Sequence, residues 1–324
     1  MSPTFSIIIP HYNIPDLLMR CLKSIPVSED IQVIVVDDHS PDADTYLERY
    51  PELSRPYLEF IRAPKNGGAG YARNVGLDHA KGKWLLFADA DDFYVDNMYD
   101  IITIYVESDA DVIFFKQRSV KSDDPNCPTI RVNSNNIDRI MDNYLKTGDE
   151  LQVRTRYWVA WGKMIKKSLI EKYRIRFEET MYSADILFSV HVGFYAKKIE
   201  AIDTVLYVLT SREGSLTSAF CSKPDELRIR ADVAFRSDRF LFQHNMCFQR
   251  LTIFYMKKML SKDRKLFKYY FTRLDEIYPS KIAALNNIRK GHSIKYQVLL
   301  YLYAFWIWLT YSHPLKERDS WIKA

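Results

Sequence analysis

The segment Lys83–Asp92, KWLLFADADD, is an apolar strand that runs directly into three carboxylates, Asp89, Asp91 and Asp92. Like charges this close repel one another and shift each other's pKa, so such a cluster is stable when a cation lies among them. Mg²⁺ and Mn²⁺ prefer oxygen ligands and are commonly shared with a substrate phosphate. The cluster therefore indicates a metal-assisted phosphate site. The alternative is a solvated acidic turn that caps the next helix.

The first 115 residues alternate continuous apolar strands with amphipathic helices. This alternation predicts a parallel sheet covered on both faces, a doubly wound nucleotide-binding architecture of the α/β class. The predicted strands are Phe5–Ile9, Ile31–Val36, Tyr57–Ile61, Trp84–Ala88 and Asp111–Phe115, and the predicted helices are Asp16–Ile25, Asp42–Tyr50 and Ala69–Ala80. Ligands of such sheets collect at the carboxyl ends of the strands.

Polar residues follow three of the predicted strands, at the edge where ligands are expected. They are residues 10–13 (PHYN), 37–40 (DDHS) and 89–92 (DADD). Because the carboxyl ends of parallel strands meet at one edge of a sheet, we expect these three clusters to form one site.

The downstream sequence continues the pattern less regularly. It predicts a polar loop to about Ser134, a helix over 137–154, a helix with a basic outer face over Trp158–Tyr173, a helix over Ala184–Ala196 and a strand over Ile199–Thr210. Beyond about residue 224 the chain changes to long basic helical segments such as Met256–Arg273. We therefore expect a catalytic domain of residues 1–220 and a helical, basic and aromatic region of residues 221–324.

The segment 296–312, YQVLLYLYAFWIWLTYS, contains no charged residue and is flanked by lysine and arginine. It is shorter than the roughly 20 apolar residues that a spanning helix needs. Tyrosine and tryptophan favour the headgroup region, and basic flanks favour anionic lipid. We predict that residues 293–312 contact a membrane surface. The alternatives are a buried helix of a small C-terminal bundle or a dimer contact.

Charge and cysteine usage bear on the partners of the protein and on its cellular compartment. A formal charge of +5 is too weak to indicate a nucleic-acid partner, so none is expected. The four cysteines form no Cys-x-x-Cys pair, which argues against a zinc ribbon and favours a reducing compartment. The N-terminal residues do not read as a secretory signal. These features predict a cytoplasmic protein, peripheral at the inner face of the cell membrane.

The motifs SIIIPHYN, VIVVDDHS, KNGGAGYARNVGLDHAKGKWLLFADADD and RFEETMYSADILF occur in the order and spacing of family 2 glycosyltransferases. The chain resembles that family over about residues 4–217. The resemblance implies a GT-A fold, a doubly wound, mostly parallel sheet flanked by helices, here with a helical C-terminal extension. It also implies inverting transfer of one sugar from a nucleoside-diphosphate sugar, with UDP the expected nucleotide, to a glycan or lipid-linked acceptor, as in bacterial surface polysaccharide synthesis.

The resemblance implies roles for individual residues. Donor-binding residues would be Pro10, His11, Tyr12, Asn13, Asp38, Arg73, Asp89, Ala90, Lys163 and Arg212. Within this set, Tyr12 would stack on the base and Asp38 would bond to the base edge. Asp91, with help from Asp89, would hold Mn²⁺ or Mg²⁺. Asp92 would support the site or cap a helix starting near Tyr94.

Several of these residues also have ordinary structural alternatives. Asp37 is expected to orient its loop, cap a helix or occupy a turn. A dinucleotide-binding motif needs a third glycine at the position of Arg73, so the glycine-rich stretch is not such a motif. It is interpreted instead as a loop that begins a helix near the nucleotide. Lys163 and Arg212 would neutralise diphosphate or grip an acceptor, or else are surface cations.

The resemblance places the general base in a Glu-Asp pair, which here reads Ala184-Asp185. Asp185 keeps the position of the base, and the alternative is a helix N-terminal charge that favours the helix dipole.

Two other functions remain open. A sugar nucleotidyltransferase would need a glycine-rich basic loop after the first strand, and PHYNIPD is not one. A non-catalytic nucleotide-sugar-binding protein is favoured if Ala184 marks a decayed site.

Overall fold

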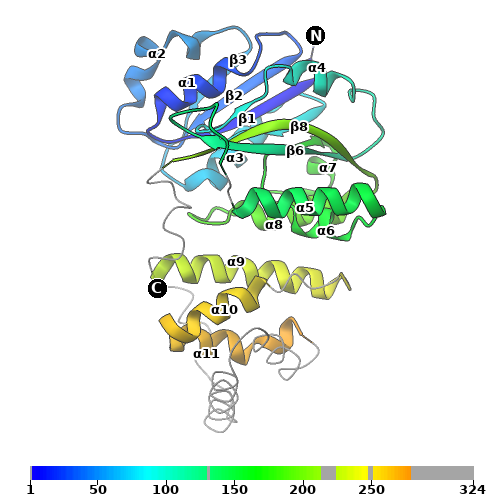
Figure 1. Ribbon diagram of the computed structural model, residues 1–324. Helices are drawn as coiled ribbons and strands as arrows, with labels where there is room; N and C mark the ends of the chain where they lie inside the picture. The colour runs from blue at the N-terminus through cyan, green and yellow to red at the C-terminus, as the bar shows by residue number, and fades with distance from the viewer. Residues whose placement is uncertain (1, 130–131, 213–223, 247–250, 279–324) are drawn as a thin grey trace. The chain divides into compact units, whose positions relative to one another are not determined.

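The computed structural model describes residues 2–129, 132–212, 224–246 and 251–278. The chain divides into two compact units, residues 1–220 and 221–324. All the residues predicted to form the site belong to the first unit, which is built on one eight-stranded sheet of order β3-β2-β1-β4-β7-β6-β8-β5 (Figure 1).

The strands and helices of the first unit alternate along the chain. The strands are β1 (Phe5–His11), β2 (Ile31–Asp37), β3 (Leu58–Arg62), β4 (Trp84–Phe87), β5 (Phe93–Tyr94), β6 (Val112–Lys121), β7 (Lys163–Lys166) and β8 (Ile199–Ser211). The helices are α1 (Pro15–Lys23), α2 (Tyr46–Arg49), α3 (Gly68–His79), α4 (Met98–Thr103), α5 (Val132–Thr147), α6 (Leu151–Arg156), α7 (Lys167–Tyr173) and α8 (Asp185–Tyr195), with short 3-10 turns η1 (Ala43–Thr45) and η2 (Pro51–Ser54).

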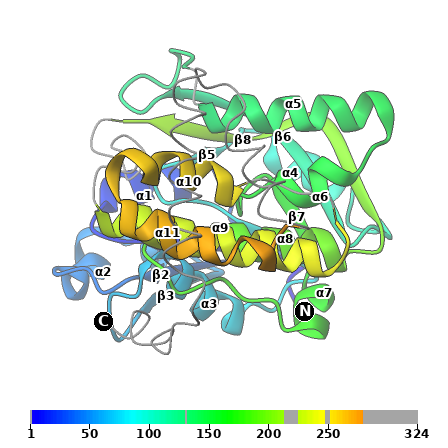
Figure 2. The same ribbon diagram turned by 90° about the horizontal axis from the view of Figure 1, so that it is seen from below.

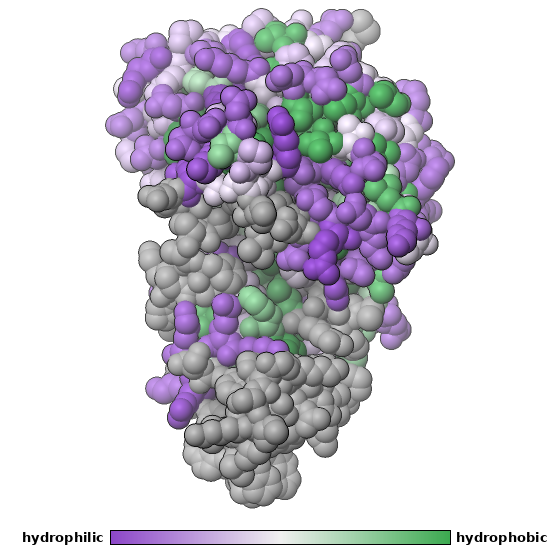
Figure 3. All heavy atoms as spheres, viewed as in Figure 1, coloured by the Kyte–Doolittle hydropathy of each residue, from purple (hydrophilic) through white to green (hydrophobic). Residues whose placement is uncertain are grey.

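The core lies on both faces of the sheet. Every residue of β1 and β2 is buried, and since alternate residues of a strand point to opposite faces, both faces must be covered. Figures 1 and 2 show the helices of this unit distributed over the two sides. In Figure 3 the described surface of the unit is mostly hydrophilic, in keeping with apolar residues gathered at the sheet.

Parallel pairing dominates the half of the sheet that carries the predicted site. β1 pairs in parallel with both β2 and β4, and β2 pairs in parallel with β3. The register places His11 opposite Asp37, so the ends of β1 and β2 are level. In the other half, β6 and β8 are parallel, whereas β7 and β5 pair antiparallel to their neighbours. The predicted mostly parallel, helix-flanked sheet is confirmed.

Three local predictions were wrong. Residues 158–173 do not form one basic helix: Lys163–Lys166 is strand β7, buried between β4 and β6, and only Lys167–Tyr173 is helical. The predicted helix over 137–154 is broken between α5 and α6 by Gly148, whose φ of +73° suits glycine. The helix expected to start near Tyr94 begins later, as α4 at Met98, because Phe93–Tyr94 forms β5 against β8.

The described part of the second unit is helical, as the composition indicated. It contains α9 (Pro224–Gln243), α10 (Leu251–Lys262), α11 (Arg264–Thr272) and the turn η3 (Leu274–Glu276). The single helix predicted over Met256–Arg273 is interrupted at Asp263, whose side chain accepts the Leu266 N–H and caps α11. Among the described residues no helix is long and apolar enough to cross a membrane. Residues 293–312 lie outside the described residues, so their predicted membrane contact stays a prediction.

Candidate active site

A buried hydrogen-bond network of His11, Asp37 and Ser40 joins the end of β1 to the end of β2. Nδ1 of His11 lies 2.9 Å from Oδ1 of Asp37, and the Ile14 N–H donates to Nε2 of His11. Nε2 is therefore the acceptor, and Nδ1 carries the proton and donates to Asp37. Ser40 adds its hydroxyl and its backbone N–H to the same carboxylate, at 2.6 and 2.8 Å. Asp37 thus orients its loop, one of the roles expected for it.

Hydrogen bonds set the charge state of Asp37. Burial by itself raises the pKa of this carboxyl, but the bonds from His11 and Ser40 outweigh burial and hold the pKa below its ordinary value. Asp37 is fully buried and His11 is 2% exposed, so neither side chain has a free face at the rim of the site. The predicted contact between His11 and a nucleotide stays a prediction.

The residues beside His11 differ in exposure. Pro10 is buried in β1 opposite Val36. Tyr12 is 47% exposed, a large aromatic ring at the strand end. Asn13 adopts a φ of +52° and donates its N–H to the Ser40 hydroxyl at 2.8 Å. The predicted stacking of a base on Tyr12 therefore has an exposed ring available, and it stays a prediction.

Asp38 anchors the glycine-rich loop. Its two carboxylate oxygens accept the backbone N–H groups of Gly67 and Gly68 at 2.8 and 2.7 Å, and the side chain is almost wholly buried. Gly68 has a φ of +82°, a left-handed conformation that favours glycine. Asp38 thereby fixes the start of α3. Its predicted bond to the base edge is untested.

Close packing on α3 brings a distant segment to the site. A Cβ on Gly70 would lie 2.1 Å from the carbonyl oxygen of Glu178, so only glycine lets this segment approach. Asn74 ties the same segment to α3, accepting the Phe177 N–H at 2.9 Å and donating to the Phe177 carbonyl at 3.0 Å. The segment then leads directly into α8, which starts at Asp185.

The acids after β4 meet arginines from two other parts of the chain. Nη2 of Arg73, a 6% exposed residue of α3, lies 2.5 Å from Oδ1 of Asp89, and Nε of Arg212 lies 3.3 Å from Oδ2 of Asp91. The side chains of Asp89 and Asp91 are 35% and 25% exposed. The pKa of Asp91 is raised, chiefly by burial and then by the charge of Asp89. The structure thus brings these four predicted residues together.

The turn that carries these acids is fixed by residues that the sequence did not reveal. The Thr210 N–H donates to Oδ1 of Asp92 at 2.7 Å, and the Tyr207 hydroxyl lies 3.2 Å from Oδ2 of Asp92 and accepts the Asp89 N–H at 2.8 Å. Arg20 of α1 donates to the Asp91 carbonyl at 2.6 Å. Asp92 therefore supports the site and caps no helix.

Sequence reasoning missed Arg20, Tyr207 and Thr210 because no local signal distinguishes them. Each lies more than 70 residues from the turn that it holds, and only the sheet order brings them together. Ala90, between the acids, is 3% exposed and therefore packs against the core. Its predicted contact with the donor stays a prediction.

Asp185 is the first residue of α8 and lies among charges of both signs. Burial raises the pKa of this carboxyl. The charges of Arg73 and Lys163 oppose the rise, and that of Asp89 adds to it. A carboxylate with a raised pKa is a stronger proton acceptor than an exposed one, as general-base catalysis requires. Asp185 nonetheless remains partly exposed to solvent.

Lys163 is 1% exposed, so the alternative of a surface cation was wrong for this residue. Its ammonium donates to the carbonyls of Tyr157 and Val159 at 2.8 and 2.7 Å and to the hydroxyl of Ser189 at 3.0 Å. All three ammonium protons therefore have partners within the protein. Its predicted contact with a sugar donor stays a prediction.

The donor set after β4 suits a divalent cation that is shared with a ligand. Among the residues that the structure describes, no group of three or more His, Cys, Asp or Glu side chains could hold a metal ion alone. Mg²⁺ is usually held by one or two carboxylates plus substrate phosphates. Asp89 and Asp91 offer two partly exposed carboxylates whose mutual repulsion raises the pKa of Asp91, and a cation would relieve that repulsion.

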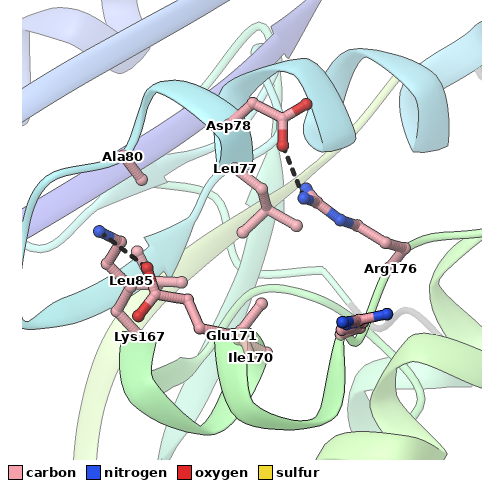
Figure 4. Close-up of a pocket in the computed structure, with 9 residues that line it drawn as sticks. Leu77, Asp78, Ala80, Leu85, Lys167, Ile170, Glu171 and Arg176 are labelled. Atoms are coloured by element: carbon pink, nitrogen blue, oxygen red, sulfur yellow. Dashed lines mark ion pairs between the residues drawn. The ribbon is translucent and has the colours of Figure 1, made fainter.

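A cavity of about 480 Å³ lies elsewhere, where the C-terminal end of α3 meets α7. Figure 4 shows its two ion pairs, Asp78–Arg176 and Lys167–Glu171, whose charged atoms lie 2.6 and 3.1 Å apart. None of the predicted site residues lines this cavity. We therefore locate the candidate site at the strand ends, where the acids, the arginines and Asp185 converge.

A doubly wound sheet with paired acids and a candidate base at its strand ends is typical of nucleotide-dependent transferases. Residues 6–174 match glycosyl transferase family 2, and the chain belongs to this family. The family prediction made from the sequence is confirmed.

Relatives and solved structures agree with that membership. The chain is 28% identical over 230 residues to the uncharacterized glycosyltransferase EpsJ of Bacillus subtilis strain 168, covering 67% of this chain and 64% of EpsJ. It is 28% identical over 233 residues to the poly(ribitol-phosphate) beta-N-acetylglucosaminyltransferase TarS of Staphylococcus aureus strain Mu50, covering 68% of this chain and 38% of TarS. The matches thus span less than two thirds of the length of these curated relatives.

The fold of TarS is also similar. The crystal structure of S. aureus TarS 1-349 in complex with UDP-GlcNAc superposes with a TM-score of 0.57 at 23% identity, covering 94% of this chain and 88% of that one. This likeness shows the GT-A fold that the sequence predicted.

Proposed function

We propose that this chain is an inverting glycosyltransferase that moves one sugar from a nucleoside-diphosphate sugar, with UDP as the nucleotide, to a hydroxyl of a glycan or lipid-linked acceptor. Family membership supports the reaction type. The name of TarS, an N-acetylglucosaminyltransferase that acts on a poly(ribitol-phosphate) chain, supports a hexose or N-acetylhexosamine donor and a polymer acceptor for the present chain as well.

The observation that carries the proposal is the position of Asp185. Its carboxylate starts α8, remains partly exposed and feels the charges of both Arg73 and Asp89. A proton acceptor and the acids that face a diphosphate therefore belong to one cluster. In a single-displacement reaction these two functions must flank the anomeric carbon.

The proposed chemistry needs one proton transfer. The acceptor hydroxyl attacks the anomeric carbon, its proton passes to Asp185, and the bond from that carbon to the diphosphate oxygen breaks. Asp91, with help from Asp89, would hold Mn²⁺ or Mg²⁺, which offsets the charge that develops on the departing nucleoside diphosphate. Arg73 and Arg212 hold these carboxylates in place and add positive charge beside them.

A non-catalytic binding protein is the rival function, because Ala184 replaces the first acid of the family pair. The packing of Ala184 gives a different reason for the replacement. A Cβ on Gly70 would lie 2.8 Å from the Ala184 Cβ, and Ala184 is 7% exposed, so this position packs tightly on α3. A small residue there is a packing requirement that leaves Asp185 in place.

The test of the proposal is sugar transfer and donor hydrolysis with radiolabelled UDP-sugars and Mn²⁺. We expect Asp185→Asn to lower kcat about 100-fold or more, the usual scale for a general base. The matched control is Glu179→Gln, an exposed acid of the same segment, which should retain activity. Both variants should keep the melting-temperature rise that UDP with Mn²⁺ gives the native protein. Full activity of Asp185→Asn, or no turnover of any UDP-sugar by the native chain, would contradict the proposal.

We further propose that the protein is peripheral at the inner face of the cell membrane, where a lipid-linked acceptor is concentrated. Only the sequence of residues 293–312 supports this proposal. Deleting residues 293–324 should leave UDP binding intact and move the protein from the membrane fraction to the supernatant. An unchanged membrane fraction after the deletion would refute it.

A further inference from the structure

Lys163 carries a buried amino group that forms no ion pair with the residues that the structure describes. It lies on β7 at 1% exposure. Burial lowers the pKa of this ammonium to about 7, and the negative charge of Asp185 opposes that shift. Burying an unpaired charge is costly, so a Met or Leu at this position would serve the core better. The side chain therefore needs an explanation beyond packing.

The bonds of Lys163 lead to the helix that carries the candidate base. Ser189, which accepts from its ammonium at 3.0 Å, lies on α8 four residues after Asp185. Residues four apart share one face of a helix. Lys163 therefore bonds to α8 one turn after Asp185 and on the same face. The Ser189 hydroxyl also lies 3.0 Å from the Trp158 carbonyl, and this contact ties α8 to the loop before β7.

The loop before β7 also connects, through Tyr207, to the turn that carries the acids after β4. It contains Trp161, whose ring stacks on that of Tyr207 with centroids 5.3 Å apart and planes 8° from parallel. The Tyr207 hydroxyl in turn bonds to Asp89 and Asp92. Lys163 therefore links the helix of the candidate base to the turn of the candidate metal ligands.

A second cation holds the far end of α8 and provides a comparison. Arg154 donates to the carbonyls of Gly193 and Ala196 at 2.8 and 2.6 Å. These groups lie two to three turns beyond Asp185 along the helix. Both cations anchor α8, and only Lys163 lies near the carboxylate.

We propose that Lys163 is a positioning residue for Asp185, fixing the first turns of α8 so that the carboxylate faces the sugar donor, without touching the donor itself. This inference rests on the proposed function, because it needs Asp185 as the base. It replaces the donor contact that the sequence predicted for Lys163.

The experiment compares Lys163→Met with the native chain under saturating donor and acceptor, at a temperature well below the melting point of both. We expect kcat to fall roughly 10- to 100-fold, the scale of a misplaced catalytic group. The KM for the donor and the Kd for UDP with Mn²⁺ should change less than about twofold, because the donor contacts remain. In an Asp185→Asn background, Lys163→Met should cause no further loss of the residual rate.

The matched control is Arg154→Met, which removes the other cation that anchors α8. It should lower the melting temperature as Lys163→Met does. It should leave kcat within about twofold, because it releases the end of α8 that lies far from Asp185. Should Lys163→Met not fold, Ser189→Ala removes only one of the three bonds and should lower kcat about threefold with unchanged UDP binding.

Several results would overturn the inference. One is an equal rate loss for Lys163→Met in the native and Asp185→Asn backgrounds, and another is a raised Kd for UDP with kcat retained. The third is an unchanged kcat in Ser189→Ala where Lys163→Met does not fold. An active Lys163→Met beside an inactive Asp185→Asn would remove this inference alone. An active Asp185→Asn would remove the proposed function together with it.

Discussion

Two pairs of aspartates at the same end of the sheet have opposite surroundings. Asp37 and Asp38, at the end of β2, are almost wholly buried, and backbone N–H groups or neighbouring side chains bond to all their oxygens. Asp89 and Asp91, after β4, are partly exposed, and each is paired with one arginine. The residue type is the same, and both pairs lie where a parallel strand ends. The hydrogen-bond donors supplied by the fold decide which pair is satisfied within the protein and which pair is available to a ligand.

The pKa shifts of Asp37 and Asp91 follow the same division, and that of Asp38 does not. Burial raises the pKa of Asp91, as does the charge of Asp89, and few donors oppose the rise. Burial also acts on Asp37, but the bonds from His11 and Ser40 reverse its effect. Asp38 is the exception: burial raises its pKa, as it raises that of Asp91, although two backbone N–H groups oppose the rise. The number and kind of donors therefore separate these carboxyls better than burial does.

The largest expected effect is on the pair left to bind a ligand. Asp91→Asn should lower kcat/KM about 100- to 1000-fold, because it removes the carboxylate that we propose as the main ligand of a cation that stabilises the leaving group. Its unfolding free energy should not fall, since burial and the charge of Asp89 disfavour the carboxylate more than the ion pair with Arg212 favours it. Steady-state kinetics with a Mn²⁺ titration and urea unfolding measure the two quantities. Asp96→Asn, an exposed acid just downstream, is the control. Activity that survives Asp91→Asn would erase the contrast between the two pairs.

The next prediction tests whether packing on α3 holds the segment that leads to Asp185 in place. It changes no carboxylate. Gly70→Ala places a methyl group 2.1 Å from the Glu178 carbonyl, so the segment that leads to Asp185 must shift. We expect a loss of about 2–4 kcal/mol in unfolding free energy, together with a fall in kcat. Gly148→Ala meets no atom within 4 Å and should cost only about 1–2 kcal/mol, for its left-handed backbone. Equal losses in urea unfolding would show that the close approach to α3 is unimportant.

Acid titration should distinguish Asp37 from Asp91 by the sign of its effect on stability. The pKa of Asp37 is lower in the folded state than in the unfolded chain, so its contribution to stability is present above about pH 4 and is lost as pH falls through the folded value. Asp37→Asn should therefore lose about 1–3 kcal/mol at pH 6 and show a shallower fall between pH 5 and pH 3. Urea unfolding across that range measures both. An unaltered acid slope in the variant would mean that Asp37 is not the group that titrates.

The parallel half of the fold and the three polar clusters could be predicted because their signals are local. Continuous apolar runs in β1, β2 and β4 set the strands, and the polar residues that follow each run in sequence also follow it in space. Even Arg73 could be placed, because it lies one turn into the helix that the glycine-rich loop opens.

The other half could not be predicted because its order depends on distant pairing. The central antiparallel strand β7 is four residues long and lysine-rich, so its composition resembled a basic helix. The burial of Lys163 follows from that strand, and no pattern around AWGKMI indicates it. The bonds from Tyr207, Thr210 and Arg20 to the acidic turn likewise depend on which strands become neighbours.

The smallest expected effect isolates one donor in the buried network. Ser40→Ala removes the hydroxyl that donates to Asp37 at 2.6 Å and accepts the Asn13 N–H at 2.8 Å. We expect a loss of about 1 kcal/mol in unfolding free energy, because the His11 and Ser40 backbone donors to Asp37 remain. The pKa of Asp37 should rise, so the acid loss of stability should begin at a higher pH than in the native chain. Ser54→Ala, at an exposed position, is the control. A Ser40→Ala variant with native acid stability would show that His11 and the Ser40 backbone N–H set the charge of Asp37, and the contrast with Asp91 would then rest on these two donors.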